Sequence, residues 1–223
     1  MLVDIHSHQT ASKPNIKKLF NLDIKEEALE SEIEVFFGEN TSVSIGIHPW
    51  SVSVDRWSEQ LEFMERLVVN QRVKAIGEVG LDKIKGPDLA LQEEVFIKQI
   101  RLAERVRKPI IVHCVKSYNE MLAIKKILMP KVPLILHGFN RKPEMAMKLA
   151  KKGFILSFGK ALINSQLVQE ALKNIPLEQV LFETDDSESM EISEIYLKAC
   201  EVLNVELEEL EEKIYQNYLE LYL

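Results

Sequence analysis

Cysteine, glycine and proline are scarce in this sequence. Its 223 residues include 2 cysteines, 8 glycines and 8 prolines, which excludes a disulfide framework, a collagen-like repeat and a glycine-rich linker. No window approaches the roughly 18 uninterrupted apolar residues of a transmembrane helix. The opening segment MLVDIHSHQT lacks the basic and apolar regions of a secretory signal. These absences lead us to expect a cytoplasmic protein in which Cys114 and Cys200 stay reduced.

Positive charge is the smaller share of the charged residues. The 28 lysines and arginines against 35 aspartates and glutamates give a formal net charge of −7. This balance argues against a tight, charge-driven grip on nucleic acid, but not against transient catalysis on it. With 46% hydrophobic residues, the composition is that of a globular protein rather than a disordered or coiled-coil one. We find no internal repeat or flexible linker, and therefore expect a single domain over residues 1–223.

Short apolar runs alternate with amphipathic segments along the chain. Near-continuous apolar runs are typical of strands buried on both faces of a parallel sheet. The predicted strands are Leu2–His6, Lys17–Leu22, Val43–His48, Val73–Glu78, Pro109–His113, Val132–His137, Phe154–Phe158 and Val180–Asp185. About 28 residues per repeat is what one strand and one crossover helix need. The sequence thus predicts an α/β fold, a (β/α)8 TIM-type barrel, with a doubly wound open sheet as the alternative.

Helix boundaries are also marked in the sequence. Asp88 is placed to cap a helix that runs to Val106, and Pro143 and Gly153 stand where a helix would begin and end. The stretch 206–221 repeats apolar residues at helical spacing, which predicts a C-terminal helix.

Histidine is rare and is placed in a regular way. The five histidines each close an apolar run: His6, His8, His48, His113 and His137. Two further predicted strands end at or near Glu78 and Asp185. In parallel α/β folds the chemistry sits at the carboxyl ends of the strands, where a barrel would bring these groups to one mouth. Residues two apart on a strand face the same side, so His6 and His8 can bind one ion.

The number of candidate ligands indicates more than one cation. Taken singly, Glu78 could pair with a lysine, Asp185 could cap a helix, and each histidine could be a core residue. The candidate ligands are His6, His8, Glu78, His113, His137 and Asp185, which are too many for one tetrahedral zinc. They suffice for two cations about 3.5 to 4 Å apart that share a bridging carboxylate, for which Glu78 is the candidate. This set predicts metal-assisted hydrolysis.

Six segments carry a family resemblance. DIHSH, GIHPW, AIGEVGLDK, IIVHC, LHGF and LFETD, spread over residues 4–186, resemble the TatD family of metal-dependent deoxyribonucleases. The resemblance implies a barrel of the wider amidohydrolase group and a divalent-metal phosphodiesterase that acts from DNA ends, like a 3′-end exonuclease. It implies that His6, His8, Glu78 and Asp185 bind one metal, and that Glu78, His113 and His137 bind the other. It also implies that His48 touches substrate phosphate.

Departures from the family pattern concern the substrate side. Asp186-Ser187-Glu188 replaces the usual Ala-Pro-aromatic, and the residues after His113 and His137 also differ. The segment between His8 and His48 is shorter than usual, which predicts an abbreviated second βα unit. No ligand type is lost, so these departures bear on the substrate more than on the chemistry.

The expected reaction uses two divalent cations, Mg, Mn or Zn, and three catalytic side chains. Glu78 bridges the cations, Asp185 orients or deprotonates the attacking water, and His48 donates to a phosphate oxygen. DNA or a nucleotide ester is the expected transient partner of a monomer or weak oligomer, with no membrane. The alternatives are a D-aminoacyl-tRNA deacylase, another ester or amide hydrolase of the same barrel group, and a non-catalytic metal-binding scaffold. Trp50 is predicted to pack at the barrel rim, with stacking on a base as the alternative.

Overall fold

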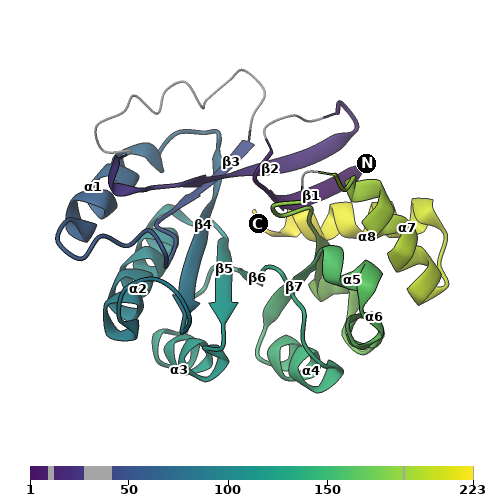
Figure 1. Ribbon diagram of the computed structural model, residues 1–223. Coiled ribbons are helices and arrows are strands. Elements are labelled where there is room, and N and C mark those ends of the chain that lie inside the picture. The colour runs from purple at the N-terminus through teal and green to yellow at the C-terminus, as the bar shows by residue number, and fades with distance from the viewer. Residues whose placement is uncertain (10–12, 28–41, 188, 223) are drawn as a thin grey trace. The chain divides into compact units, whose positions relative to one another are not determined.

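Eight strands and eight α-helices follow one another in the computed structural model, which describes residues 1–9, 13–27, 42–187 and 189–222 (Figure 1). The strands are β1 (Leu2–Ser7), β2 (Ile16–Asp23), β3 (Ser42–Gly46), β4 (Val73–Asp82), β5 (Ile110–Val115), β6 (Leu134–Leu136), β7 (Phe154–Phe158) and β8 (Val180–Phe182). The helices are α1 (Trp57–Leu67), α2 (Leu89–Val106), α3 (Tyr118–Leu128), α4 (Pro143–Lys151), α5 (Lys160–Asn164), α6 (Gln166–Lys173), α7 (Ile192–Leu203) and α8 (Leu207–Glu220), with a 3-10 turn, η3 (Leu177–Gln179), before β8. The strand order in the sheet is the chain order, β1 to β8.

The internal contacts of the chain fall into two compact units. Unit 1 comprises Met1–Phe20 and Leu134–Leu223, and unit 2 comprises Asn21–Pro133. One boundary falls inside β2, and the other falls directly before β6. The single domain expected over residues 1–223 stays a prediction.

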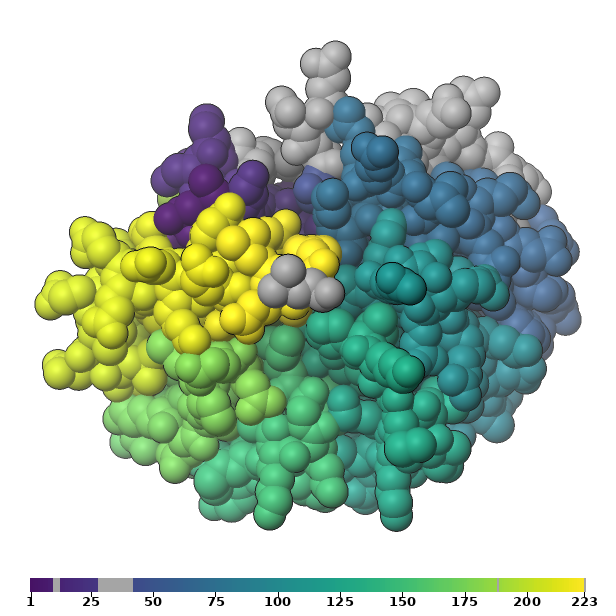
Figure 2. All heavy atoms as spheres, turned by 180° about the vertical axis from the view of Figure 1, so that it is seen from behind, coloured from purple at the N-terminus to yellow at the C-terminus, as the bar shows by residue number. Residues whose placement is uncertain are grey.

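Unit 1 brings the two ends of the chain together. β6, β7 and β8 pair in parallel, and β1 pairs in parallel with the first part of β2. A parallel bridge joins Ser7 to Asp185, so the first strand lies beside the segment that follows the last strand. α8 packs on β1, and Figure 2 shows the yellow C-terminal segment against the purple N-terminal segment. The Met1 ammonium lies 2.7 Å from the Glu211 carboxylate. Closure of the first strand on the last is what a barrel requires.

Unit 2 is built on the parallel strands β3, β4 and β5. α2 packs on β4 and is capped at its start by Asp88, whose side chain accepts from the Leu91 N–H. Two glutamines of this helix reach into the strand ends. Gln99 bonds both backbone groups of Ile47, and Gln92 bonds both backbone groups of Asp82. The helix therefore fixes the residue before His48 and the last residue of β4, four positions after Glu78.

The predicted strands are all present; Phe154–Phe158 has the predicted ends, and the other seven differ at one end or both. β4 continues to Asp82, so Glu78 lies inside the strand rather than at its end. Gly80 permits this extension, because a Cβ at that position would lie 2.0 Å from the His113 carbonyl oxygen on β5. β6 and β8 end before His137 and Asp185, which stand in the following loops. The predicted helices at Asp88, Pro143 and the C-terminus are confirmed.

Two further expectations concern the rest of the chain. The abbreviated second βα unit falls largely on residues 28–41, outside the described residues. No helix in the part of the chain that the structure describes is both long and apolar enough to cross a membrane.

Candidate metal centre

Three predicted ligands of unit 1 converge on the seam between β1 and the end of β8. His6 lies on β1, His8 follows it, and Asp185 lies opposite. The Asp185 N–H donates to the His6 carbonyl (2.9 Å), and the His8 N–H donates to the Asp185 carbonyl (3.0 Å). These two bonds hold Asp185 at a left-handed φ of 53°, a conformation that aspartate tolerates better than most residues. The main chain thus sets the position of all three side chains.

The spacing of these side chains fits a shared cation. The Asp185 Oδ1 lies 3.4 Å from the His6 Nε2 and 3.6 Å from the His8 Nε2, longer than ordinary hydrogen bonds. Ligand atoms about 2.1 Å from one ion, at tetrahedral angles, lie about 3.4 Å apart. Two imidazoles and a carboxylate suit Zn and Mn, and the carboxylate also suits Mg.

The side chain of Asp4, on β1, holds the loop that carries Asp185. The Asp4 carboxylate accepts from the Thr184 N–H (2.9 Å) and from the Thr184 hydroxyl (2.8 Å). Burial raises the pKa of Asp4 to about 6, although the Thr184 hydrogen bonds and Lys18 act in the opposite direction. Sequence reasoning missed this residue. The signal was a single carboxylate inside the apolar run LVDIH, which needs a partner when buried.

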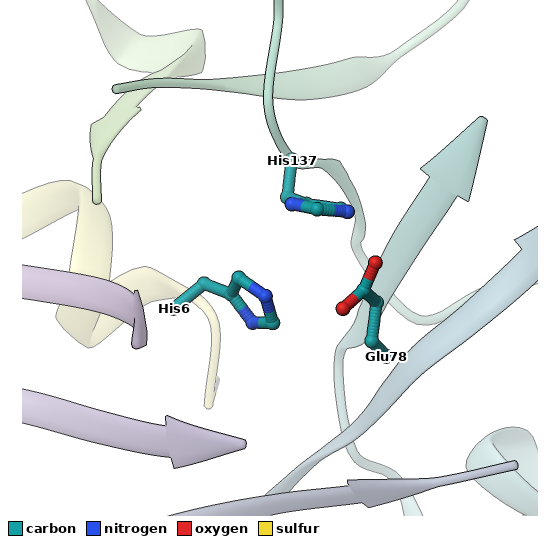
Figure 3. Close-up of side chains that lie close together, drawn as sticks. All are labelled: His6, Glu78 and His137. Atoms are coloured by element: carbon teal, nitrogen blue, oxygen red, sulfur yellow. The ribbon is translucent and has the colours of Figure 1, made fainter. Parts of the chain in front are cut away.

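His137 and Glu183 extend the same cluster. The His137 ring lies 4.5 Å from the His6 ring, centroid to centroid (Figure 3). Glu183 is fully buried, and its Oε1 accepts from the Gly138 N–H and lies 3.7 Å from the His137 Nδ1. Its Oε2 is buried without a hydrogen-bond partner among the described residues. A buried carboxylate oxygen of this kind is costly unless a cation or proton compensates it. His137, Glu183 and Asp185 also form a group within metal-binding distance.

Unit 2 gathers the other three predicted site residues. The Glu78 Oε1 lies 2.7 Å from the His113 Nδ1 and 3.2 Å from the His48 Nε2. The two imidazole nitrogens are 3.3 Å apart, and all three side chains are almost fully buried. Figure 3 shows the Glu78 carboxylate at the end of a side chain that extends from β4. This group is a second candidate for a cation.

Asp82 faces the Nε2 atom of His113, and Glu78 faces the other ring nitrogen, Nδ1. The Asp82 Oδ2 lies 3.2 Å from the His113 Nε2 and accepts a 2.6 Å bond from the Trp50 indole. Burial raises the pKa of Asp82. Hydrogen bonds from the Ile84 N–H, Trp50 and His113 together outweigh this effect, so the net shift of the pKa is downward. The ionised carboxylate is placed to accept the His113 Nε2 proton, and with a cation bound the Nδ1 lone pair would face that cation beside Glu78. A carboxylate behind a ligating histidine is the usual arrangement in metal sites.

His48 has the opposite proton arrangement. Its Nδ1 accepts from the Trp50 backbone N–H at 3.1 Å. The proton of the neutral ring is then on Nε2, which makes that atom a hydrogen-bond donor rather than a metal ligand. The assignment of His48 to substrate rather than to metal stays a prediction.

Each unit gathers several of the predicted site residues within itself. His6, His8, His137 and Asp185 come together in unit 1, and His48, Glu78 and His113 come together in unit 2. The bridging role of Glu78 and the pairing of His137 with His113 stay predictions. Sequence reasoning missed Asp82 and Glu183 as partners of histidines. Each ends an apolar run, in GEVGLD and VLFE, and this is the signal that could have found them.

Comparison with known proteins identifies relatives over almost the whole chain. The family described as TatD related DNase matches residues 5–223. The chain is 32% identical to YabD of Bacillus subtilis, described as an uncharacterized metal-dependent hydrolase, over 83% of this chain and 80% of that protein. It is 28% identical to the similarly described MJ1582 of Methanocaldococcus jannaschii, over 80% of this chain and 74% of the relative.

A solved structure shares the fold. The crystal structure of YJJV, a TatD homologue from Escherichia coli, superposes with a TM-score of 0.81 over 99% of this chain and 97% of that one, at 18% identity. This likeness confirms the predicted fold class, the (β/α)8 barrel with a C-terminal helix.

Proposed function

Because the chain belongs to the family of TatD related DNases and is a metal-dependent hydrolase, we propose that it hydrolyses phosphodiester bonds of DNA from a 3′ end. One observation carries the proposal. Asp185 faces two imidazoles at metal-ligand spacing in unit 1, at the predicted position of the attacking water. In unit 2, His48 presents an N–H donor of the kind that binds a phosphate oxygen.

The side chains of each unit have separate roles toward the metal. In unit 1, His6, His8 and Asp185 would hold one cation, and in unit 2, Glu78 and His113 would hold another. Bound Mg, Mn or Zn would lower the pKa of a water molecule toward neutrality and offset the negative charge that develops on the phosphate. The bridging position of Glu78 remains part of this proposal, and two metal ions per chain are the expected stoichiometry.

The remaining chemistry belongs to the protein. The second oxygen of the Asp185 carboxylate orients the attacking water and accepts its proton. The His48 Nε2 donates to a non-bridging phosphate oxygen, and its proton is kept on that atom by the Trp50 backbone. Asp4 holds Thr184, and so keeps the Asp185 loop in place during the reaction.

The test is nucleotide release from 3′-end-labelled single-stranded DNA by the metal-loaded protein. We expect release that chelator abolishes, and a loss of roughly 100-fold or more in the Asp185→Asn variant, the range for removal of a general base. Asp186→Asn is the matched control, because it removes the same charge from an exposed neighbour.

Two outcomes would count against the proposal. Wild-type rates in Asp185→Asn would remove this residue from the reaction. If the protein binds metal and leaves DNA intact, DNA is not the substrate, and aminoacyl esters become the next compounds to assay.

A further inference from the structure

Trp50 is a large aromatic side chain left in solvent beside a buried ligand cluster. Its exposed fraction is 46%, whereas the neighbouring His48 and His113 are almost fully buried. Its ring lies 4.7 Å from the His48 ring and 5.6 Å from the His113 ring, edge to face. A tryptophan that served only to pack the rim would have its face covered by other side chains. Here the indole stays accessible to solvent beside the His48 and His113 rings.

The exposed ring is nevertheless held in one orientation. The indole N–H donates to the Asp82 Oδ2 at 2.6 Å, and the Trp50 backbone N–H donates to the His48 Nδ1 at 3.1 Å. An aromatic surface that is already immobilised loses little conformational entropy when a ligand stacks on it. Both anchors belong to the cluster, so the position of the ring is tied to that of His48 and His113.

A lysine is arranged by the same carboxylate. The Lys85 Nζ lies 3.7 Å from the centre of the Trp50 ring, and its backbone N–H donates to the Asp82 Oδ1 at 3.2 Å. In water an exposed cation–π contact is weaker than the stacking of a nucleobase on an aromatic side chain. A base can therefore displace the ammonium from the ring face. The flexible, exposed lysine then remains within reach of the phosphate attached to that base.

We propose that Trp50 and Lys85 form a subsite beside His48 and His113 for an unpaired nucleobase and its phosphate. This inference rests on the proposed function and specifies its substrate as a single-stranded end. Stacking needs a base that is not already stacked and paired in a duplex. Because every base has a π-face, the subsite tolerates any sequence. The net charge of −7 disfavours binding to a long stretch of DNA through charge alone. A single fixed stacking surface does not need such binding.

The first test compares two substrates that differ only in their bases. One is a 3′-labelled single-stranded oligodeoxynucleotide, and the other carries tetrahydrofuran abasic residues at its last two positions. We expect the wild-type kcat/KM to favour the base-bearing end by at least about fivefold. Trp50→Ala should lose this preference, so that the ratio of the two kcat/KM values falls to about one, whereas Trp50→Phe should keep part of it. Trp57→Phe, in the other tryptophan, is the control and should behave as the wild type.

A second test isolates the lysine. Lys85→Ala should reduce the slope of log(kcat/KM) against log[salt] by about one, as expected for one lost phosphate contact. Lys83→Ala is the matched control, because Lys83 is already paired with Glu120 at 2.6 Å and should leave the slope unchanged. An unaltered slope in Lys85→Ala would remove the lysine from the subsite.

The outcomes separate this inference from the proposed function. If Trp50→Ala, folded and metal-loaded, keeps the wild-type ratio between the two substrates, the subsite does not exist. If the wild type cleaves neither substrate, the proposed function fails, and fluorescence of the Trp57→Phe variant then decides on the subsite. Quenching of the remaining tryptophan by a thymidine dinucleotide, but not by abasic deoxyribose phosphate, would support it, and no quenching would overturn it.

Discussion

A single carboxylate, Asp82, joins Trp50 and His113 in unit 2. It accepts from the indole of Trp50 and faces the His113 Nε2. Replacement by asparagine leaves a side chain of the same shape in which one oxygen has become an N–H donor. An Nδ2 in place of the Asp82 Oδ2 donates and cannot accept, so His113 and Trp50 lose the acceptor that they share.

We predict that Asp82→Asn lowers the affinity for Mn or Zn by about 10- to 100-fold, the usual cost of losing the carboxylate behind a ligating histidine. Isothermal titration calorimetry of the metal-free protein measures this directly. Asp88→Asn is the control, because asparagine caps a helix as well as aspartate does and the same charge is removed. Equal metal affinity in wild type and Asp82→Asn would refute the role.

The ligands were easier to predict than the residues that position them. His6 and His8 are two residues apart, and each predicted ligand lies in or just after an apolar run of the sequence. Asp82 acquires its role only because Trp50 and His113, distant in the sequence, meet at its carboxylate. Glu183 likewise depends on its approach to His137 in the folded chain. Such pairings depend on the register of neighbouring strands, which cannot be determined from the sequence alone.

At the scale of elements, strand identity was predictable and strand length was not. A buried parallel strand is an apolar run, and the eight runs coincide with the eight strands. β4 extends past its apolar run because the backbone of Gly80 meets that of His113 on β5. Close backbone approach is a tertiary effect that periodicity cannot reveal.

The junction between α1 and β5 contains a lysine whose charge is destabilised by folding. The Lys108 ammonium donates to the carbonyl of Val68 at the end of α1. Burial, and then the nearby charge of Lys74, lower the pKa of Lys108 to about 8. Between pH 8 and pH 10.5 the unfolded chain therefore binds more protons than the folded one, and the free energy of unfolding rises with pH.

We predict that wild type gains about 1 kcal/mol relative to Lys108→Met between pH 8 and pH 10. The full shift would correspond to about 3 kcal/mol, and the half-buried position of the side chain reduces it through solvent screening. Urea unfolding of both proteins at the two pH values measures the difference. Lys126→Met, in an exposed lysine, controls for the loss of one ammonium. A wild-type advantage that does not change with pH would contradict the assignment.

At the scale of the whole molecule, the ligand set of unit 1 joins segments that are far apart in the sequence. Asp4 and Thr184 are 180 positions apart and are joined by hydrogen bonds, and the ligands His6, His8 and Asp185 stand beside them. A contact that closes so long a loop restricts the unfolded chain more than a local contact does. A cation bound there should therefore stabilise the seam where β1 meets the end of β8.

We predict that Mn or Zn at about 100 times its dissociation constant stabilises the folded protein by about 2.7 kcal/mol, a rise in Tm of roughly 5 to 10 °C for a chain of this size. Hydrogen exchange should locate the effect, because the N–H groups of His8 and Asp185 form the two backbone bonds of the seam and should exchange more slowly with metal. Chelator should reverse both changes, and His8→Ala should show little of either. A rise in Tm without protection of these two amides would mean that the metal stabilises the protein from another site, and the ligand set in unit 1 would then have to be reassigned.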